Sequence, residues 1–204
     1  MRTLVIDSAT EACSAALFED GALIAGASEV IGRGHAERLV PMIAELPGKG
    51  RAERIAVSLG PGSFTGVRIG LAAARALGLA WKADVFGYPT LALLAAMARQ
   101  AHPGPVTVCM TGGHGEWFMQ DFGADGLPET TVRSLAPAQA AAAARHRVIA
   151  GSQAKTLKAV GHPGGAVLDI LPDARCFPAL PEVLLTTDLS PRYGRPPDAR
   201  LPAA

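Results

Sequence analysis

The stretch GPGSFTG, at residues 60–66, has the glycine and hydroxyl content of a phosphate-binding loop. A P-loop needs the spacing G-x-x-x-x-G-K-[ST], and no Gly-Lys pair follows here at that distance. The dinucleotide fingerprint G-x-G-x-x-G also fails, because three residues separate Gly62 from Gly66. The spacing therefore favours a rigid turn that starts a helix, with Ser63 and Thr65 as candidate N-caps.

A second candidate segment is DSAT at residues 7–10, where Asp7 closes an apolar stretch and Thr10 follows three residues later. An acid closing a strand before a hydroxyl resembles the first phosphate segment of actin-like and sugar-kinase-like ATPases. Asp7 and Thr10 are therefore the candidate cofactor-binding residues, and a hydrogen-bonded turn is the alternative. Such an ATPase would need a second acid in the hairpin of the second half, where Met110 and Thr111 stand instead.

No residue pattern predicts a catalytic or metal-binding group. The sequence contains no H-E-x-x-H, and no two histidines are four residues apart, whereas zinc needs at least three closely placed ligands. A Ser-His-Asp order and paired carboxylates are not recognisable either. The three cysteines, Cys13, Cys109 and Cys176, are scattered, which favours reduced thiols over a disulfide framework. We expect no catalytic residue and no metal.

The composition is that of a folded globular protein without a nucleic-acid footprint. Of the 204 residues, 49% are hydrophobic and 18% are charged, and the net charge is +1. Autonomous nucleic-acid binding normally needs a basic patch. Asp7 and Glu11 interrupt the apolar N-terminus, and no window reaches about 18 apolar residues. We expect a soluble cytoplasmic protein that does not contact a membrane.

The pattern of apolar residues predicts two α/β lobes, residues 1–102 and 103–204. In the first lobe, three strands (3–6, 13–18 and 23–30) precede a helix from His35 that is kinked or restarts at Pro41. A strand (55–59), a helix (67–81), a short strand (85–86) and a helix (89–99) follow. The second lobe repeats the hairpin-then-helix plan, with strands at 106–110, 116–122, 129–133 and 147–150 and helices at 137–145 and 152–160, the last capped by Ser152.

The helix at 67–81 lacks the polar face that a one-sided surface helix shows. Small or apolar residues fill it, and only Arg68 and Arg75 interrupt them. It is either wholly buried or covered by a partner chain. On the second reading, a large charged residue at Gly70 or Ala74 should abolish partner binding and leave the monomer folded.

Three segments of the first hundred residues resemble the TsaB (YeaZ) family: IDSATEACSAAL (6–17), HAERLVPMI (35–43) and above all GPGSFTGVRIG (60–70). PRYGR at 191–195 resembles the C-terminal element of that family. The resemblance implies an actin-like (ASKHA, ribonuclease-H-like) two-lobed α/β fold, with mixed sheets flanked by helices. It also implies a non-catalytic scaffold subunit, required with TsaD and TsaE for threonylcarbamoyl transfer to the adenosine adjacent to the tRNA anticodon.

The resemblance further implies the partners and the interface. A TsaD-like protein would bind the helices from His35 and from Thr65, a TsaE-like ATPase would join, and the isolated chain would use the same surface as a homodimer. tRNA would be met only through the complex. The chain would have no cofactor of its own, with ATP or ADP near the partner interface. The interface residues would be His35, Leu39, Ser63, Thr65, Arg68, Ile69, Gly70, Ala73, Ala74 and Leu77.

Two other functions stay open. An actin-like ATPase or phosphotransferase would act through Asp7 and Thr10, but the sequence offers no general base. A peptidase acting on TsaD-like proteins would need a nucleophile–base pair that is not recognisable. The second lobe departs from the family, which has Asp-Ala-Arg where this chain has Thr111-Gly112-Gly113.

Overall fold

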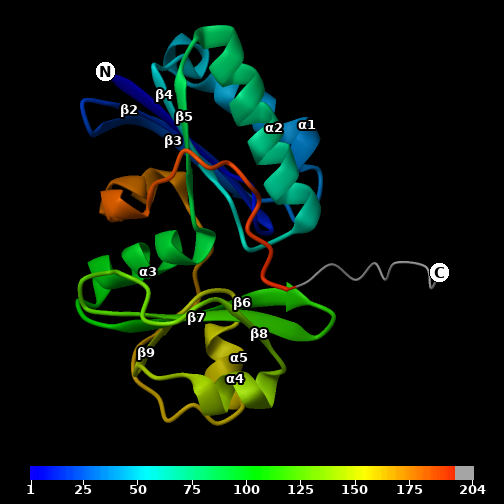
Figure 1. The fold of residues 1–204 in the computed structure, drawn as a ribbon, viewed down its shortest axis with the longest axis vertical. Coiled ribbons are helices and arrows are strands. Elements are labelled where there is room, and N and C mark those ends of the chain that lie inside the picture. The colour runs from blue at the N-terminus through cyan, green and yellow to red at the C-terminus, as the bar shows by residue number, and fades with distance from the viewer. Residues whose placement is uncertain (196–204) are drawn as a thin grey trace, which may run out of the picture.

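The computed structural model describes residues 1–195 as two lobes (Figure 1). The first lobe is built on a five-stranded sheet of order β3-β2-β1-β4-β5. Its strands are β1 (Arg2–Asp7), β2 (Ala12–Glu19), β3 (Ala22–Val30), β4 (Arg54–Ser58) and β5 (Asp84–Tyr88). β1, β2 and β3 pair antiparallel, whereas β1, β4 and β5 run parallel. The prediction of hairpins first and crossovers afterwards is confirmed.

Successive side chains along each strand point to opposite faces of this sheet, and both faces are buried. Leu4 and Ile6 point to the face covered by α1 (His35–Glu45) and α2 (Phe64–Trp81). Val5, between them, points to the opposite face, which packs on α3 (Thr90–Ala101). α1 runs through Pro41 as one helix and does not restart there, and the 3-10 turn η1 (Pro47–Gly50) follows it.

The second lobe holds another five-stranded sheet, of order β10-β9-β6-β7-β8. Its strands are β6 (Val106–Gly113), β7 (Glu116–Phe122), β8 (Arg133–Leu135), β9 (Val148–Ala150) and β10 (Val167–Leu168), with helices α4 (Pro137–Ala143) and α5 (Ala154–Ala159) on its outer face.

Two local predictions in the second lobe are wrong. The strand expected at 129–133 is β8, which starts only at Arg133. Ser152 does not cap α5, whose N-cap is Gln153. The Ser152 hydroxyl instead accepts a hydrogen bond from the backbone N–H of Thr111 (3.2 Å) on the neighbouring strand.

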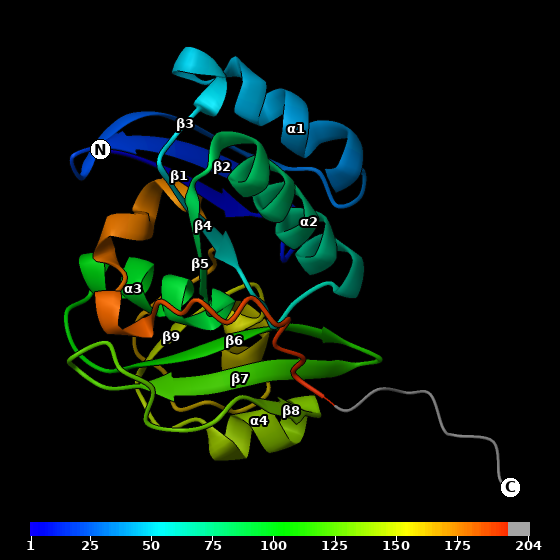
Figure 2. The same ribbon diagram turned by 45° about the horizontal axis from the view of Figure 1, so that its top comes forward.

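α3 lies between the two sheets (Figure 2). One hydrophobic core spans both lobes around it. Val5 and Tyr88 enter this core from the first lobe, and Val108 and Phe122 enter it from the second. The lobes are therefore joined side by side through α3.

The chain then returns to the first lobe. The 3-10 segment η2 (Ala174–Ala179) packs on β1, β2 and β3, and η3 (Glu182–Leu184) follows. The predicted division assigned residues 103–204 to the second lobe, whereas residues 174–179 pack on the first. Residues 196–204 of that predicted lobe lie outside the described residues. Within residues 1–195 no helix is long and apolar enough to cross a membrane.

Candidate functional site

The start of α2 is fixed by close packing against the β1–β2 turn. The helix begins at Phe64, three residues earlier than predicted, and Ser63 caps it by accepting from the Gly66 N–H (3.2 Å). Thr65 lies inside the first turn and is not the cap. The Ser8 hydroxyl donates to the Gly66 carbonyl (2.9 Å), and a Cβ at Gly66 would overlap the Ser8 carbonyl. Gly66 therefore allows the helix to approach the β1–β2 turn, and the predicted turn that starts a capped helix is observed.

Asp7 faces the protein interior. It is only 1% exposed, its Oδ1 accepts from the Ala9 N–H (3.0 Å), and its Oδ2 accepts from the Tyr88 hydroxyl (3.0 Å). Burial raises the pKa of the Asp7 carboxyl from 3.8 to about 6, although the hydrogen bonds from Ala9 and Tyr88 lower it. Asp7 is not among the residues that line the cleft described next, and its role in cofactor binding stays a prediction.

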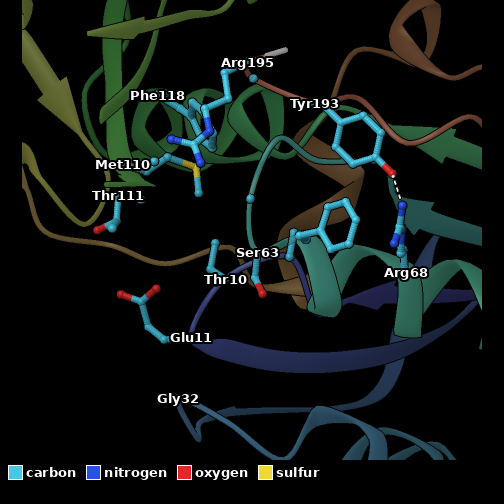
Figure 3. A pocket seen from close by; sticks show the side chains of 16 residues that line it. Thr10, Glu11, Gly32, Ser63, Arg68, Met110, Thr111, Phe118, Tyr193 and Arg195 are labelled. Carbon is cyan, nitrogen blue, oxygen red and sulfur yellow. Dashed lines mark hydrogen bonds between the residues drawn. The ribbon is translucent and has the colours of Figure 1, made fainter. Parts of the chain in front are cut away.

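A cleft of about 800 Å³ lies between the lobes (Figure 3). It is lined from four segments, which are the β1–β2 turn with Gly32 nearby, the start of α2, the β6–β7 hairpin, and the C-terminal residues. The lining consists of Ala9, Thr10, Glu11, Gly32, Gly62, Ser63, Phe64, Arg68, Met110, Thr111, Gly112, Gly113, Phe118, Tyr193, Gly194 and Arg195. The cleft thus brings together three predicted site residues, Thr10, Ser63 and Arg68.

The lining is poor in groups that do chemistry. Thr10 Oγ1 accepts from the Ala12 N–H (3.2 Å) and is held within its own turn. Met110 and Thr111 occupy the place where an ATPase would need its second acid, and among residues 1–195 Glu11 is the one acidic residue in the lining. Residues 1–195 contain no group of three or more His, Cys, Asp or Glu side chains placed to hold a metal ion.

An aromatic–cation stack, which was not predicted from the sequence, forms one wall of the cleft. The Arg68 guanidinium lies over the Phe64 ring (3.5 Å to its centroid) and donates through Nη2 to the Tyr193 hydroxyl (3.0 Å). The Phe64 and Tyr193 rings stack with centroids 5.6 Å apart. The PRYGR motif was a signal for this contact, but nothing in the sequence pairs Tyr193 with α2.

The predicted interface residues divide into buried and accessible ones. His35, Leu39, Gly70 and Ala74 are buried within the lobe, so these four predictions are wrong as surface positions. His35 Nε2 lies 3.3 Å from the Ala12 carbonyl oxygen, and a Cβ at Gly70 would lie 2.6 Å from Ser8 Oγ. The other six predicted residues are accessible. At the start of α2, Ser63, Thr65 and Arg68 are exposed. Along its middle, Ile69, Ala73 and Leu77 are half-buried.

An exposed apolar face runs along the two helices on the outside of the first lobe. We call it the α1–α2 face; it consists of Ala36, Val40, Pro41, Ala44, Ala72, Ala76, Leu79 and Ala80, all exposed. Val40 is 57% exposed and Leu79 is 85% exposed. The sequence signal for this face was two sets of three apolar residues spaced four apart, at 36–40–44 and 72–76–80. Residues four apart share one side of a helix.

Comparison with known proteins places this architecture in a family. The family model described as TsaD, tRNA N6-adenosine threonylcarbamoyltransferase, matches residues 28–165. The TsaB protein of Escherichia coli is 43% identical over 100 residues, which are 47% of this chain and 43% of that protein. The chain belongs to the TsaD family and, within it, to the TsaB (YeaZ) group. The alignment thus spans less than half the length of this curated TsaB relative.

Other TsaB-group proteins agree. TsaB of Haemophilus influenzae is 41% identical over 103 residues, 48% of this chain and 42% of that protein. The solved structure of YeaZ from Pseudomonas aeruginosa superimposes with a TM-score of 0.73 at 27% identity, covering 88% of this chain and 89% of that one. The TsaB resemblance and the predicted actin-like fold of two mixed sheets flanked by helices are confirmed.

Proposed function

We propose that this TsaB-group chain is a non-catalytic, cytoplasmic scaffold subunit in the biosynthesis of threonylcarbamoyladenosine on tRNA. A TsaD-like protein binds the α1–α2 face, a TsaE-like ATPase joins the pair, and tRNA is met only through the complex. The observation that carries the proposal is the exposed apolar face of α1 and α2, in the lobe that matches the curated TsaB proteins.

The chemistry of this face suits a protein partner. Burying one exposed Val or Leu side chain contributes about 1.5–3 kcal/mol, so Val40 and Leu79 alone give a sizeable driving force. The alanines let a second helix approach closely. Glu37 and Glu45 flank the apolar strip on α1, which gives it a polar rim.

Two features support a non-catalytic role. The carboxylate of Asp7 is buried against Tyr88, and Met110 and Thr111 replace the second acid of an ATPase hairpin. We infer that the chain has no cofactor of its own. An ATP or ADP molecule bound in the interlobe cleft would contact Thr10 and Ser63, which line it.

Binding to the co-expressed TsaD-like protein of the source organism, measured by isothermal titration, tests the proposal. Leu79→Glu should weaken binding by about 2 kcal/mol or more, roughly 30-fold, because it places a charge in the apolar centre. Val183→Glu is the matched control, since Val183 is 75% exposed but lies on η3, outside the α1–α2 face. Threonylcarbamoyl transfer by the isolated chain would contradict the scaffold role.

The same face would be used by a homodimer when the chain is isolated. Analytical ultracentrifugation of the wild type and of Leu79→Glu separates the two states, because the variant should sediment as a monomer. The alternative function, an actin-like ATPase or phosphotransferase, is favoured only by the interlobe cleft with Thr10 in its wall. Tight binding and hydrolysis of Mg-ATP by the lone chain would promote that alternative.

A further inference from the structure

Residues 186–194 form a strap that runs from the first lobe to the second. It begins beside β5, where Thr186 and Gly87 exchange two backbone hydrogen bonds (2.7 and 3.0 Å). It continues past α2, where Arg75 donates to the Leu189 carbonyl (3.1 Å). Figure 1 shows this red segment descending beside α2 to the edge of the second-lobe sheet.

The end of the strap contacts residues of the first lobe beside the cleft. The Arg192 N–H donates to the Leu59 carbonyl (2.7 Å), which fixes the strap to the loop after β4. The Tyr193 ring then stacks on Phe64, and its hydroxyl accepts from Arg68 (Figure 3). The Arg68 guanidinium, which lies over Phe64 and bonds to the Tyr193 hydroxyl, combines cation–π attraction with a directed hydrogen bond.

The next residue reaches the other lobe. A Cβ at Gly194 would overlap the ring of Phe118, so the backbone there lies directly against β7. Only glycine allows this approach. Within two residues the strap therefore passes from an anchor on α2 of the first lobe to a contact on the sheet of the second.

This contact lies where it can restrain the rotation of one lobe relative to the other. The shared core around α3 joins the lobes on one side (Figure 2). The strap joins them at the cleft, which residues of the β6–β7 hairpin and of the start of α2 both line. A rotation of one lobe about the α3 side would widen the cleft. It would also pull Gly194 and Phe118 away from the Phe64–Arg68–Tyr193 stack.

We propose that the strap is a latch that holds the two lobes at their observed angle and sets the width of the interlobe cleft. Tyr193, stacked on Phe64 and hydrogen-bonded to Arg68, is its anchor on the first lobe, and Gly194 against Phe118 is its contact on the second. Releasing the anchor opens the cleft without unfolding either lobe, because Tyr193 lies half exposed outside the hydrophobic cores.

The test is a distance measurement between the lobes of the full chain. Nitroxide labels are placed at Arg33→Cys, exposed next to the cleft residue Gly32, and at Lys155→Cys, exposed on α5. Cys176→Ser removes the half-buried native thiol, and Cys13 and Cys109 are buried. Double electron–electron resonance on labelled chain diluted with unlabelled chain then reports the intramolecular distance alone.

Tyr193→Ala should shift the distance distribution to longer values and broaden it, and Arg68→Ala should act in the same direction. Gly194→Ala should do so by pushing the strap off Phe118. The control, Thr187→Ala, changes an exposed strap residue and should leave the wild-type distribution. Circular dichroism confirms that each variant is folded. A wild-type distribution in folded Tyr193→Ala, or an equal shift in Thr187→Ala, would overturn the proposal.

Discussion

The buried carboxyl of Asp7 makes a quantitative prediction about stability and pH. Its pKa lies at about 6 in the folded chain, against 3.8 when the group is solvated. The folded state therefore holds this proton more tightly than the unfolded state does. The stability contributed by the protonated group is fully present below pH 3.8 and is lost as the pH rises to about 6.

The size of this loss follows from the two pKa values. At about 1.4 kcal/mol for each pKa unit, the rise from 3.8 to about 6 corresponds to about 3 kcal/mol of unfolding free energy. Asp7→Asn keeps an oxygen that accepts the Ala9 N–H but cannot ionise. The stability of the variant relative to the wild type should therefore increase by about 3 kcal/mol between pH 3.8 and neutral pH.

Urea unfolding of both proteins over that pH range, followed by the fluorescence of Trp81 and Trp117, measures this difference. Comparing the variant with the wild type removes the titration of every other acid from the result. A free-energy difference that stays constant with pH would refute the reasoning, because it would mean that Asp7 has the same pKa in the folded and unfolded chains.

Three further predictions concern the packing of the first lobe. Ser63→Ala should lower the unfolding free energy by about 1 kcal/mol, because it removes the N-cap of α2. Thr65 lies inside the first turn, so Thr65→Ala should lose none of that cap energy. Thermal melts of both variants give the comparison. Gly70→Asp should unfold the lone chain, because its Cβ would meet Ser8 and its charge would be buried; a folded monomer by circular dichroism would contradict this. Tyr88→Phe should cost about 1–3 kcal/mol in urea unfolding at neutral pH, because it removes a donor to the buried Asp7 carboxylate; unchanged stability would show that water replaces the hydroxyl.

The first lobe was largely predictable because its signals are local. The three strands predicted at 3–6, 13–18 and 23–30 and the Ser63 cap each depend on residues close in sequence, and each appears in the structure where the pattern placed it. The direction in which Asp7 points was not predictable. It depends on Tyr88, which is 81 residues away in sequence.

The interface residues show a second limit of sequence reasoning. Every side of α2 is small or apolar, so hydrophobicity alone cannot tell the side that packs on the sheet from the side that faces outwards. The structure assigns Gly70 and Ala74 to the sheet and Ala72 and Ala76 to the exposed side. The second lobe was harder still, because β8 has only three residues and β10 only two, which carry too little periodicity to place a strand.

The return of the chain to the first lobe has a consequence for how the protein is made. The backbone N–H of Ala174 donates to the buried Ser14 hydroxyl (3.0 Å), across 160 residues of sequence. At a synthesis rate of about 5–20 residues per second, η2 is translated on the order of ten seconds or longer after β2. During that interval the apolar surface that η2 will cover is open to chaperones and to aggregation. Rare codons within residues 15–174 would prolong this exposure, and faster translation would shorten it.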